Sequence, residues 1–151
     1  MQSQIQTMLD KGVIRKSHSP WSVPAILVPK KSADGKTKYR FCVDFRALNS
    51  ATKIDSYPLP NFEETVSTLH GSKFFTLLDF YSGFWQLHIA EQHKERTAFS
   101  VPSGHYEFQR LPFGLANYPV NFQRFMGTVL RDLIGPECWA FIDDIVIFPA
   151  Q

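Results

Sequence analysis

The chain has 151 residues, of which 44% are hydrophobic and 20% charged, with a net charge of +2. This length fits about one domain with its own core, and the balanced composition excludes a wholly disordered chain. No apolar run approaches the roughly 20 residues that span a bilayer, the polar start is unlike a secretory signal, and the two cysteines lack the spacing of a zinc site or a disulfide framework.

The first seventy residues contain one predicted hairpin between two predicted helices. A short helix is expected around residues 5–9. The apolar core of SPWSVPAILVPKK reads as a strand, and Ala33-Asp34-Gly35 signals a turn before KTKYRFCVDF. Residues 24–45 therefore predict a β-hairpin with basic residues at and beside its tip. A second helix is predicted over residues 61–69.

Charge is distributed unevenly along the chain. Residues 11–53 hold ten Lys or Arg against two acidic residues, a net charge of +8, whereas residues 54–151 hold six basic and eleven acidic residues, a net charge of −5. A basic region next to an acidic one suits a polyanionic partner that must also meet metal-binding carboxylates. A solvated basic hairpin is the common alternative, so charge by itself decides little.

The rest of the chain is predicted to alternate short strands with one long helix. KFFTLLDF, residues 73–80, reads as a buried strand with Asp79 near its carboxyl end, and WQLHIA, TAFSV and HYEFQ as three further strands. Apolar residues at helical spacing predict a helix over residues 119–134, ended by Gly135-Pro136. CWAFIDDIVIF then predicts a hairpin with its acidic pair at or beside the tip.

The acidic pair Asp143-Asp144 lies inside the apolar octet FIDDIVIF. Buried carboxylates normally pair, bind metal or take up a proton, and an ordinary surface turn fits poorly because tight turns favour glycine. Asp79 ends another apolar strand, where a single acid could also cap a helix. Three carboxylates on two strands can hold two divalent cations for phosphoryl transfer, and oxygen ligands favour Mg²⁺ or Mn²⁺. Asp79 and Asp143 are the expected main ligands, because Asp144 would point to the other face of a strand.

Four motifs in one order carry a family resemblance. YRFCVDFRALN after a Lys-Lys pair, LLDFYSGFWQL, LPFGLANYPVNFQRFM and FIDD closely resemble the reverse transcriptase of gypsy-class LTR retrotransposons, relatives of the retroviral enzymes. The similarity runs from about Met8 to Phe148. It implies an α+β right-hand polymerase of fingers and palm, with an antiparallel palm sheet packed on helices. Residues 1–60 would be mainly fingers and residues 61–151 mainly palm with some fingers strands. The chain would stop before the thumb, connection and RNase H regions.

The resemblance also implies roles for individual residues. In that family the catalytic, metal-binding acids correspond to Asp79, Asp143 and Asp144. These acids would bind two Mg²⁺ ions, and Mn²⁺ could replace Mg²⁺. A lysine of the pair Lys30-Lys31, with spacing favouring Lys30, would reach the nucleotide phosphates together with Arg40. Phe84 would exclude a 2′-hydroxyl, although without the family it would be read as a core aromatic. Further nucleotide-binding positions are Phe80, Tyr81, Phe113 and Gly114, and the primer–template positions are Arg46, Phe141 and Ile142.

Two positions depart from the common pattern of the family. Phe113 stands where retroviral relatives usually carry Gln, and Phe141 where many carry Tyr. Phe113 can pack but cannot hydrogen-bond, and Phe141 keeps the ring without the hydroxyl. Neither departure touches the expected metal ligands.

The implied function is RNA-directed DNA polymerase chemistry, in which a primer 3′-hydroxyl attacks the α-phosphate of a dNTP. The expected partners are an RNA or DNA template with its primer, dNTPs, and the thumb and RNase H regions of a longer Pol polyprotein, without a membrane. The expected location is intracellular: the cytoplasm, a virus-like particle or the nucleus. An inactive retroelement remnant that binds nucleic acid is the alternative. A two-metal nuclease would also need clustered acids, but Phe84 and the LPFGL loop give the nuclease hypothesis no support.

Overall fold

The computed structural model describes residues 1–31, 37–81 and 83–149, except for the side chains of Lys31, Lys38, Phe62, Glu64 and Phe84. The chain forms two compact units, each built from two separate stretches. Unit 1 consists of Met1–Thr52 and Phe84–Ala116, and unit 2 of Lys53–Gly83 and Asn117–Gln151. None of the helices in the described ranges is long and apolar enough to cross a membrane.

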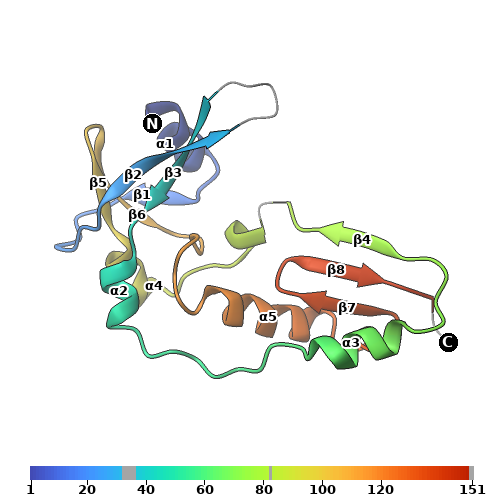
Figure 1. Ribbon diagram of the computed structural model, residues 1–151. Helices are drawn as coiled ribbons and strands as arrows, with labels where there is room; N and C mark the ends of the chain where they lie inside the picture. The colour runs from blue at the N-terminus through green and yellow to red at the C-terminus, as the bar shows by residue number, and fades with distance from the viewer. Residues whose placement is uncertain (32–36, 82, 150–151) are drawn as a thin grey trace. The chain divides into compact units, whose positions relative to one another are not determined.

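Unit 1 contains a three-stranded antiparallel sheet in the order β1-β6-β5 (Figure 1). Its strands are β1 (Ile14–Lys16), β5 (Phe99–Val101) and β6 (Gly104–Phe108). The core is aromatic: the Phe99 ring lies 5.3 Å from that of Phe108, and both side chains are buried. The first helix, α1 (Gln2–Asp10), buries Ile5 and Met8, which lie three residues apart on one helical face. The predicted N-terminal helix is thus confirmed and is longer than expected.

The basic hairpin of unit 1 pairs β2 (Ala25–Lys31) with β3 (Thr37–Val43) in an antiparallel ladder. This confirms both predicted strands, whereas the predicted turn at 33–35 lies outside the described residues. The Phe41 ring of β3 packs 5.3 Å from the Phe99 ring and thereby joins the hairpin to the core. The short helix α2 (Arg46–Ser50) comes next.

Unit 2 is an antiparallel sheet packed on a helix. The sheet has the order β4-β8-β7, with β4 (Thr76–Asp79), β7 (Cys138–Phe141) and β8 (Asp144–Ile147). Helix α5 (Tyr118–Val129) contacts β7, and Figure 1 draws it alongside the sheet. Phe122 and Met126 of α5 are fully buried, and Ala140 of β7 is buried as well. The predicted acidic hairpin is therefore confirmed.

Helix α3 (Phe62–Leu69) is the second confirmed helix, and it begins as a capped helix should. The Asn61 side chain accepts a hydrogen bond from the Glu63 N–H at 3.0 Å, which satisfies one of the free donors of the first turn.

Residues 73–80 were predicted as a buried strand, and this is wrong in one respect. β4 forms, but all four of its residues are exposed, with Leu77 at 75% and Leu78 at 47%. The reason is the strand order: β4 lies at an edge of the sheet, and α5 packs against β7 at the opposite edge. Strand formation is set by the local pattern, but burial depends on what covers the strand.

WQLHIA was predicted as a strand and forms none. Its first residues belong to the 3₁₀-helix η1 (Gly83–Gln86), and the rest makes a single bridge, from His88 to Arg110. Ile89 is nevertheless buried, which explains the apolar alternation. The ladder stops because α4 (Glu91–Lys94) and η2 (Glu95–Thr97) begin directly afterwards.

The long helix was predicted to run to residue 134 and to end at Gly135-Pro136, but α5 ends at Val129. Beyond it the chain turns so that the Leu133 carbonyl accepts hydrogen bonds from the N–H groups of Glu137 and Cys138, at 3.0 and 3.1 Å. These bonds lead directly into β7. The apolar spacing that extended the prediction is therefore shared between a helix and the turns after it.

Candidate active site

The sheet register of unit 2 brings two distant acids together. Asp79 of β4 is the direct cross-strand partner of Asp144 of β8, and Asp144 is also the partner of Phe141 of β7. Directly opposed residues project to the same face, with Cβ atoms about 4.5–5.5 Å apart. Asp79, Asp144 and Phe141 are all exposed there. One end of the sheet thus presents two carboxylates and an aromatic ring in a single row.

Asp143 lies beside this row, in the two-residue turn that joins β7 to β8. Its carbonyl accepts a hydrogen bond from the Phe80 N–H at 3.2 Å, so the turn is tied to the end of β4. Burial, together with the negative charge of Asp143, raises the pKa of Tyr118 on α5. Asp143 therefore lies between the end of β4 and the first turn of α5.

Gly83 lets the chain pass closely beside Asp143. A Cβ built on Gly83 would lie 3.1 Å from the Phe80 Cβ and 3.2 Å from the Asp143 Cβ. Both distances are shorter than ordinary van der Waals contacts, so a larger residue would push the acid-bearing turn aside. This role of Gly83 was not predicted from the sequence. The available signal was a glycine four residues after an acidic strand end.

The three acids have no basic partner among the ion pairs that the described residues form. Like charges placed directly opposite each other repel, so a bound cation would stabilise this arrangement. Within the described part of the chain, no three His, Cys, Asp or Glu side chains converge as a metal-holding group. The backbone therefore makes the acids neighbours without closing a ligand cage. Their oxygen-only chemistry and partial exposure fit a hard divalent cation.

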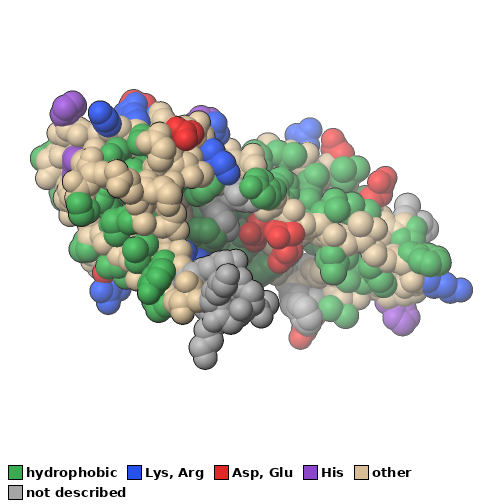
Figure 2. All heavy atoms as spheres, turned by 90° about the horizontal axis from the view of Figure 1, so that it is seen from above, with side chains coloured by type: hydrophobic (Ala, Val, Ile, Leu, Met, Phe, Trp, Pro, Cys, Tyr) green, Lys and Arg blue, Asp and Glu red, His purple; other side chains and the backbone are tan. Residues whose placement is uncertain are grey.

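Figure 2 shows acidic side chains gathered in one place among hydrophobic ones. Asp144 belongs to the exposed row with Asp79, whereas Asp143 occupies the turn, where strand alternation does not apply. The ranking of Asp143 above Asp144 as a metal ligand stays a prediction.

The acidic turn carries backbone strain. Ile142, its first residue, has a φ of 57°, and it is the only non-glycine residue with positive φ in the described ranges. A β-branched side chain strongly disfavours this conformation, which costs about 1–3 kcal/mol. Asp143-Asp144 is the acidic pair expected at or beside the tip, and the two central turn residues are Ile142 and Asp143.

Gln123 of α5 supports this turn and was also missed. Its side-chain oxygen accepts the Ile142 N–H at 2.7 Å, and its side-chain nitrogen donates to the Ala140 carbonyl at 2.9 Å. Gln123 is only 5% exposed. The signal in the sequence was a polar residue between two core positions of an apolar helix, Phe122 and Met126.

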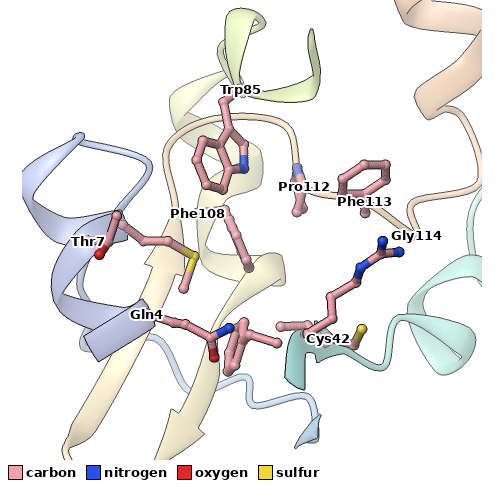
Figure 3. Close-up of a pocket in the computed structure, with 12 residues that line it drawn as sticks. Gln4, Thr7, Cys42, Trp85, Phe108, Pro112, Phe113 and Gly114 are labelled. Atoms are coloured by element: carbon pink, nitrogen blue, oxygen red, sulfur yellow. The ribbon is translucent and has the colours of Figure 1, made fainter. Parts of the chain in front are cut away.

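Three of the predicted nucleotide-binding residues line one cavity of unit 1. Arg40, Phe113 and Gly114 border a cavity of about 500 Å³. Trp85, Phe108 and Pro112 form a largely apolar wall beside them, and Gln4 and Thr7 of α1 lie across from it (Figure 3). The cavity thus combines apolar and aromatic surface with a cationic side chain, a combination typical of ligand sites.

The basic hairpin places Lys30 and Arg40 on the same face. Lys30 is the cross-strand partner of position 38, and Arg40 lies two residues beyond it on β3. Such a diagonal pair shares one face, and both side chains are exposed. The choice of Lys30 over Lys31 stays a prediction, because the Lys31 side chain lies outside the described part of the structure.

Asn49 of α2 holds the LPFGL loop through two hydrogen bonds of its side chain. The Asn49 side chain donates to the Gly114 carbonyl at 2.7 Å and accepts the Ala116 N–H at 2.8 Å. Gly114 has a φ of +91°, a conformation that favours glycine, and Phe113 is 56% exposed. This role of Asn49 was not predicted from the sequence, although Asn49 is the last residue of the motif YRFCVDFRALN.

The remaining predicted site residues have mixed surroundings. The Phe80 ring packs 5.8 Å from that of Phe122, so it contributes to the core of unit 2, whereas Tyr81 is 81% exposed. The backbone of Phe84 begins the second stretch of unit 1, but its side chain is outside the described set. Arg46 is exposed and pairs with Asp44 at 2.6 Å; hydrogen bonds from Arg46 lower the pKa of Asp44 to about 2.

The fold matches the fingers and palm of solved retroviral reverse transcriptases. The native protease–reverse transcriptase of prototype foamy virus superposes with a TM-score of 0.82 at 27% identity, covering 100% of this chain and 20% of that one. A structure of the foamy viral protease–reverse transcriptase in complex with RNA/DNA hybrid gives a TM-score of 0.83 at 26% identity, covering 99% and 19%.

The family model described as "Reverse transcriptase (RNA-dependent DNA polymerase)" matches residues 28–151, and the chain belongs to this family. Over 98% of its length it is 46% identical to the Pol polyprotein of transposon 297 from Drosophila melanogaster. Over 97% it is 44% identical to that of transposon gypsy from the same organism. The enzymatic polyprotein of Cauliflower mosaic virus (strain NY8153) is 41% identical over 96%. These matches confirm the gypsy-class resemblance.

The chain spans only 14% of the two transposon polyproteins and 21% of the viral one. Reverse transcriptases generally use divalent metal ions, which agrees with the oxygen-rich character of the acidic turn.

Proposed function

We propose that this chain is the fingers-and-palm core of an RNA-directed DNA polymerase that adds dNTPs to a primer 3′-hydroxyl. One observation carries the proposal: Asp79 and Asp144 are cross-strand partners, and Asp143 lies in the adjoining turn. Unit 2, which contains this site, is assigned to the palm, and unit 1 with its basic hairpin to the fingers. The sequence placed the change from mainly fingers to mainly palm near residue 60. The assignment proposed here follows the two units instead, so residues 84–116 also belong to the fingers.

Asp79, Asp143 and Asp144 are proposed to hold two Mg²⁺ ions, or Mn²⁺ in their place. When bound, these ions supply charge stabilisation and activation of the attacking hydroxyl in phosphoryl transfer. The contribution of the protein is the sheet register, which keeps two carboxylates adjacent despite their repulsion. The hydrogen bond from the Phe80 N–H to the Asp143 carbonyl keeps the third acid, Asp143, beside the end of β4.

Lys30 and Arg40 are proposed to bind the phosphates of the incoming nucleotide. Support comes from their shared, exposed hairpin face and from the place of Arg40 in the cavity beside Phe113 and Gly114. A guanidinium grips phosphate through two hydrogen bonds, while an ammonium supplies a compact charge. Phe84 is proposed to limit sugars to 2′-deoxy forms; Phe80 and Tyr81 keep the nucleotide-site roles that the family resemblance implies.

The proposed macromolecular partner is a primer paired to an RNA or DNA template, within a longer Pol polyprotein. Structures of the foamy viral protease–reverse transcriptase in complex with RNA/DNA hybrid and with dsDNA support this choice. In this chain Phe141 and Ile142, at the acidic turn, would lie against the primer end, and Arg46 would contact a phosphate.

Metal-dependent primer extension by the protein that carries this chain tests the proposal. Asp143→Asn should reduce extension by more than about 100-fold, because it removes a charged ligand that contributes several kcal/mol. Asp132→Asn is the matched control, since the Asp132 side chain is 88% exposed and pairs only loosely with Arg131 at 3.6 Å. Extension that persists in Asp143→Asn would remove the acids from the mechanism. Nucleic-acid binding without extension in the parent protein would favour an inactive remnant instead.

A further inference from the structure

The Gln123 side chain is buried, yet both of its polar atoms are used by one short piece of backbone. Its oxygen accepts the Ile142 N–H and its nitrogen donates to the Ala140 carbonyl, at 2.7 and 2.9 Å. The two bonded groups flank Phe141, the last residue of β7. A single amide therefore grips the chain on both sides of the residue that precedes the acidic turn.

This pattern of bonds matches that of a neighbouring parallel strand. β7 is an edge strand in the sheet order β4-β8-β7, and on its outer edge Cys138 makes one parallel bridge with Ile134. Further along the same edge, no strand pairs with β7 in the described part of the chain. A residue of a parallel strand would accept from one N–H and donate to the carbonyl two residues earlier, as Gln123 does. The side chain thus supplies one residue of strand pairing where no strand lies.

The gripped segment is the strained one. Ile142 has a φ of 57°, and a β-branched residue stays in such a conformation only where its surroundings impose it. The bond from the Ile142 N–H to Gln123 is the shorter of the two and acts directly on that residue. On the other side of Ile142 comes Asp143, whose carbonyl is held by the Phe80 N–H.

We propose that Gln123 is a positioning residue, which holds the Ile142–Asp143 turn in its strained form and so sets where Asp143 presents its carboxylate to a divalent cation. The inference rests on the proposed polymerase function for its catalytic consequence. Its structural part, the imposed turn conformation, does not. Partners that orient a metal ligand from behind typically change metal affinity or activity by about 10–100-fold when removed.

The first test measures the turn itself in the full chain. Gln123→Met keeps the length and apolar volume of the side chain but removes both hydrogen bonds. Amide hydrogen exchange at Ile142 should become at least about 10-fold faster relative to the amides of α5. Met126→Ala is the control: Met126 is fully buried on the same helix and makes no hydrogen bond to the turn. It should lower overall stability without this selective change at Ile142.

The second test measures Mn²⁺ binding and primer extension. Gln123→Met should weaken Mn²⁺ binding and raise the Mg²⁺ concentration for half-maximal extension by about 10-fold or more, with little change in the KM for dNTP. Met126→Ala should leave both metal measurements within about 2-fold of the parent protein at a temperature where both variants are folded.

A third variant separates positioning from packing. Gln123→Glu can make both bonds only when its carboxyl is protonated, because the Ala140 carbonyl needs a donor. The Mg²⁺ concentration for half-maximal extension is measured for Gln123→Glu and for Gln123→Met at the same pH. The ratio of the first concentration to the second should fall as the pH is lowered. The titratable groups in the surrounding elements, Tyr118 on α5, Cys138 on β7 and Asp143 in the turn, are the same in both variants, so the pH response that they have in Gln123→Met is divided out of this ratio.

The outcomes separate the two levels of inference. Unchanged Ile142 exchange in Gln123→Met, or an equal metal effect in Met126→Ala, would overturn the positioning role. If the parent protein does not extend primers, the proposed function fails, while the exchange and Mn²⁺ measurements still decide whether Gln123 sets the turn.

Discussion

Single residues with no acidic or basic group determine where the proposed catalytic acids lie. Gly83 leaves room for the Asp143 side chain, and Gln123 holds the turn that contains Asp143 by a hydrogen bond to Ile142. Asn49 holds the loop that contains Gly114 in the same way, by a hydrogen bond to the backbone. Each acts through contacts with backbone or with Cβ atoms, which leave little freedom to adjust. The acids therefore depend on neighbours that the acidic motif does not contain.

Gly83→Ala should reduce primer extension by roughly 10-fold, because the added methyl group would lie 3.2 Å from the Asp143 Cβ and displace it by a few tenths of an ångström. The backbone of Gly83 has no positive φ, so the effect is not one of local strain. Steady-state extension rates measured at saturating dNTP check this expectation.

Gly127→Ala is the control for that change. Its added methyl group would meet only the Tyr57 hydroxyl, at 3.1 Å, which is the far end of a side chain that can move. Its extension rate should stay within about 2-fold of the parent protein, since alanine is also the better helix former. Equal rates in Gly83→Ala and the parent protein would show that the turn tolerates displacement.

At the scale of elements, unit 1 is held by a charged network across the β1–β6 ladder. Arg15 and Glu107 are cross-strand partners, and the Arg15 Nε donates to the Glu107 carboxylate at 2.8 Å. The Ser17 hydroxyl donates to the other carboxylate oxygen at 2.6 Å, and Arg15 also pairs with Glu91. The Glu107 side chain is only 8% exposed, so its charge relies on these partners.

Glu107→Ala should lower the free energy of unfolding by about 2–3 kcal/mol, as measured by chemical denaturation. Removing one member of a buried ion pair costs up to about 3–5 kcal/mol, but Arg15 remains 39% exposed and can regain water. Glu137→Ala, at an exposed position, should change stability by less than about 0.5 kcal/mol. A similar small loss in both variants would mean that the network contributes no more than a surface pair.

In unit 2 a second charged network links α5 to the segment before α3. Arg124 donates to both oxygens of Asp55, at 2.9 and 2.7 Å, and its guanidinium lies 4.8 Å from the centre of the Tyr57 ring. Hydrogen bonds from Arg124 and from the Tyr57 N–H hold the pKa of Asp55 below its usual value. The Asn117 side chain binds the backbone of Lys53 and Asp55, so the segment is fixed along the same helix that carries Gln123.

At the scale of the whole molecule, the charge asymmetry predicts how the proposed primer–template partner would bind. Ten of the sixteen basic residues lie between residues 11 and 53, mostly in unit 1, whereas the proposed metal-binding acids lie in unit 2. Phosphate contacts from basic residues release counterions, which makes affinity fall with salt. The acids by themselves would repel a phosphate backbone, so binding must depend on the basic region.

Binding of a primer–template duplex should weaken steeply with salt, and Arg46→Gln should reduce the slope of log K against log salt by about one. Lys73→Gln removes an exposed cation in unit 2 and should leave the slope unchanged. Fluorescence anisotropy between roughly 50 and 200 mM salt measures both slopes. Equal slopes in the parent protein and Arg46→Gln would exclude Arg46 from the phosphate contacts.

The sequence by itself determined the local elements and the identity of the family. Alternating apolar residues and turn signals act over a few positions, so both hairpins, α1 and α3 were predictable, and four motifs in one order were enough for the family. The same local rules extended α5 too far and made a strand of WQLHIA, because they do not show where the next element begins or which element packs against it.

Only the tertiary structure decided how these parts meet. The pairing of Asp79 with Asp144, the exposure of β4, and the contacts of Gln123 and Gly83 with the acidic turn all join residues that are distant in the chain. A strand pattern fixes which residues share a face, but not which partner lies opposite them. The acids could therefore be named from the sequence, whereas the residues that hold them in place could not.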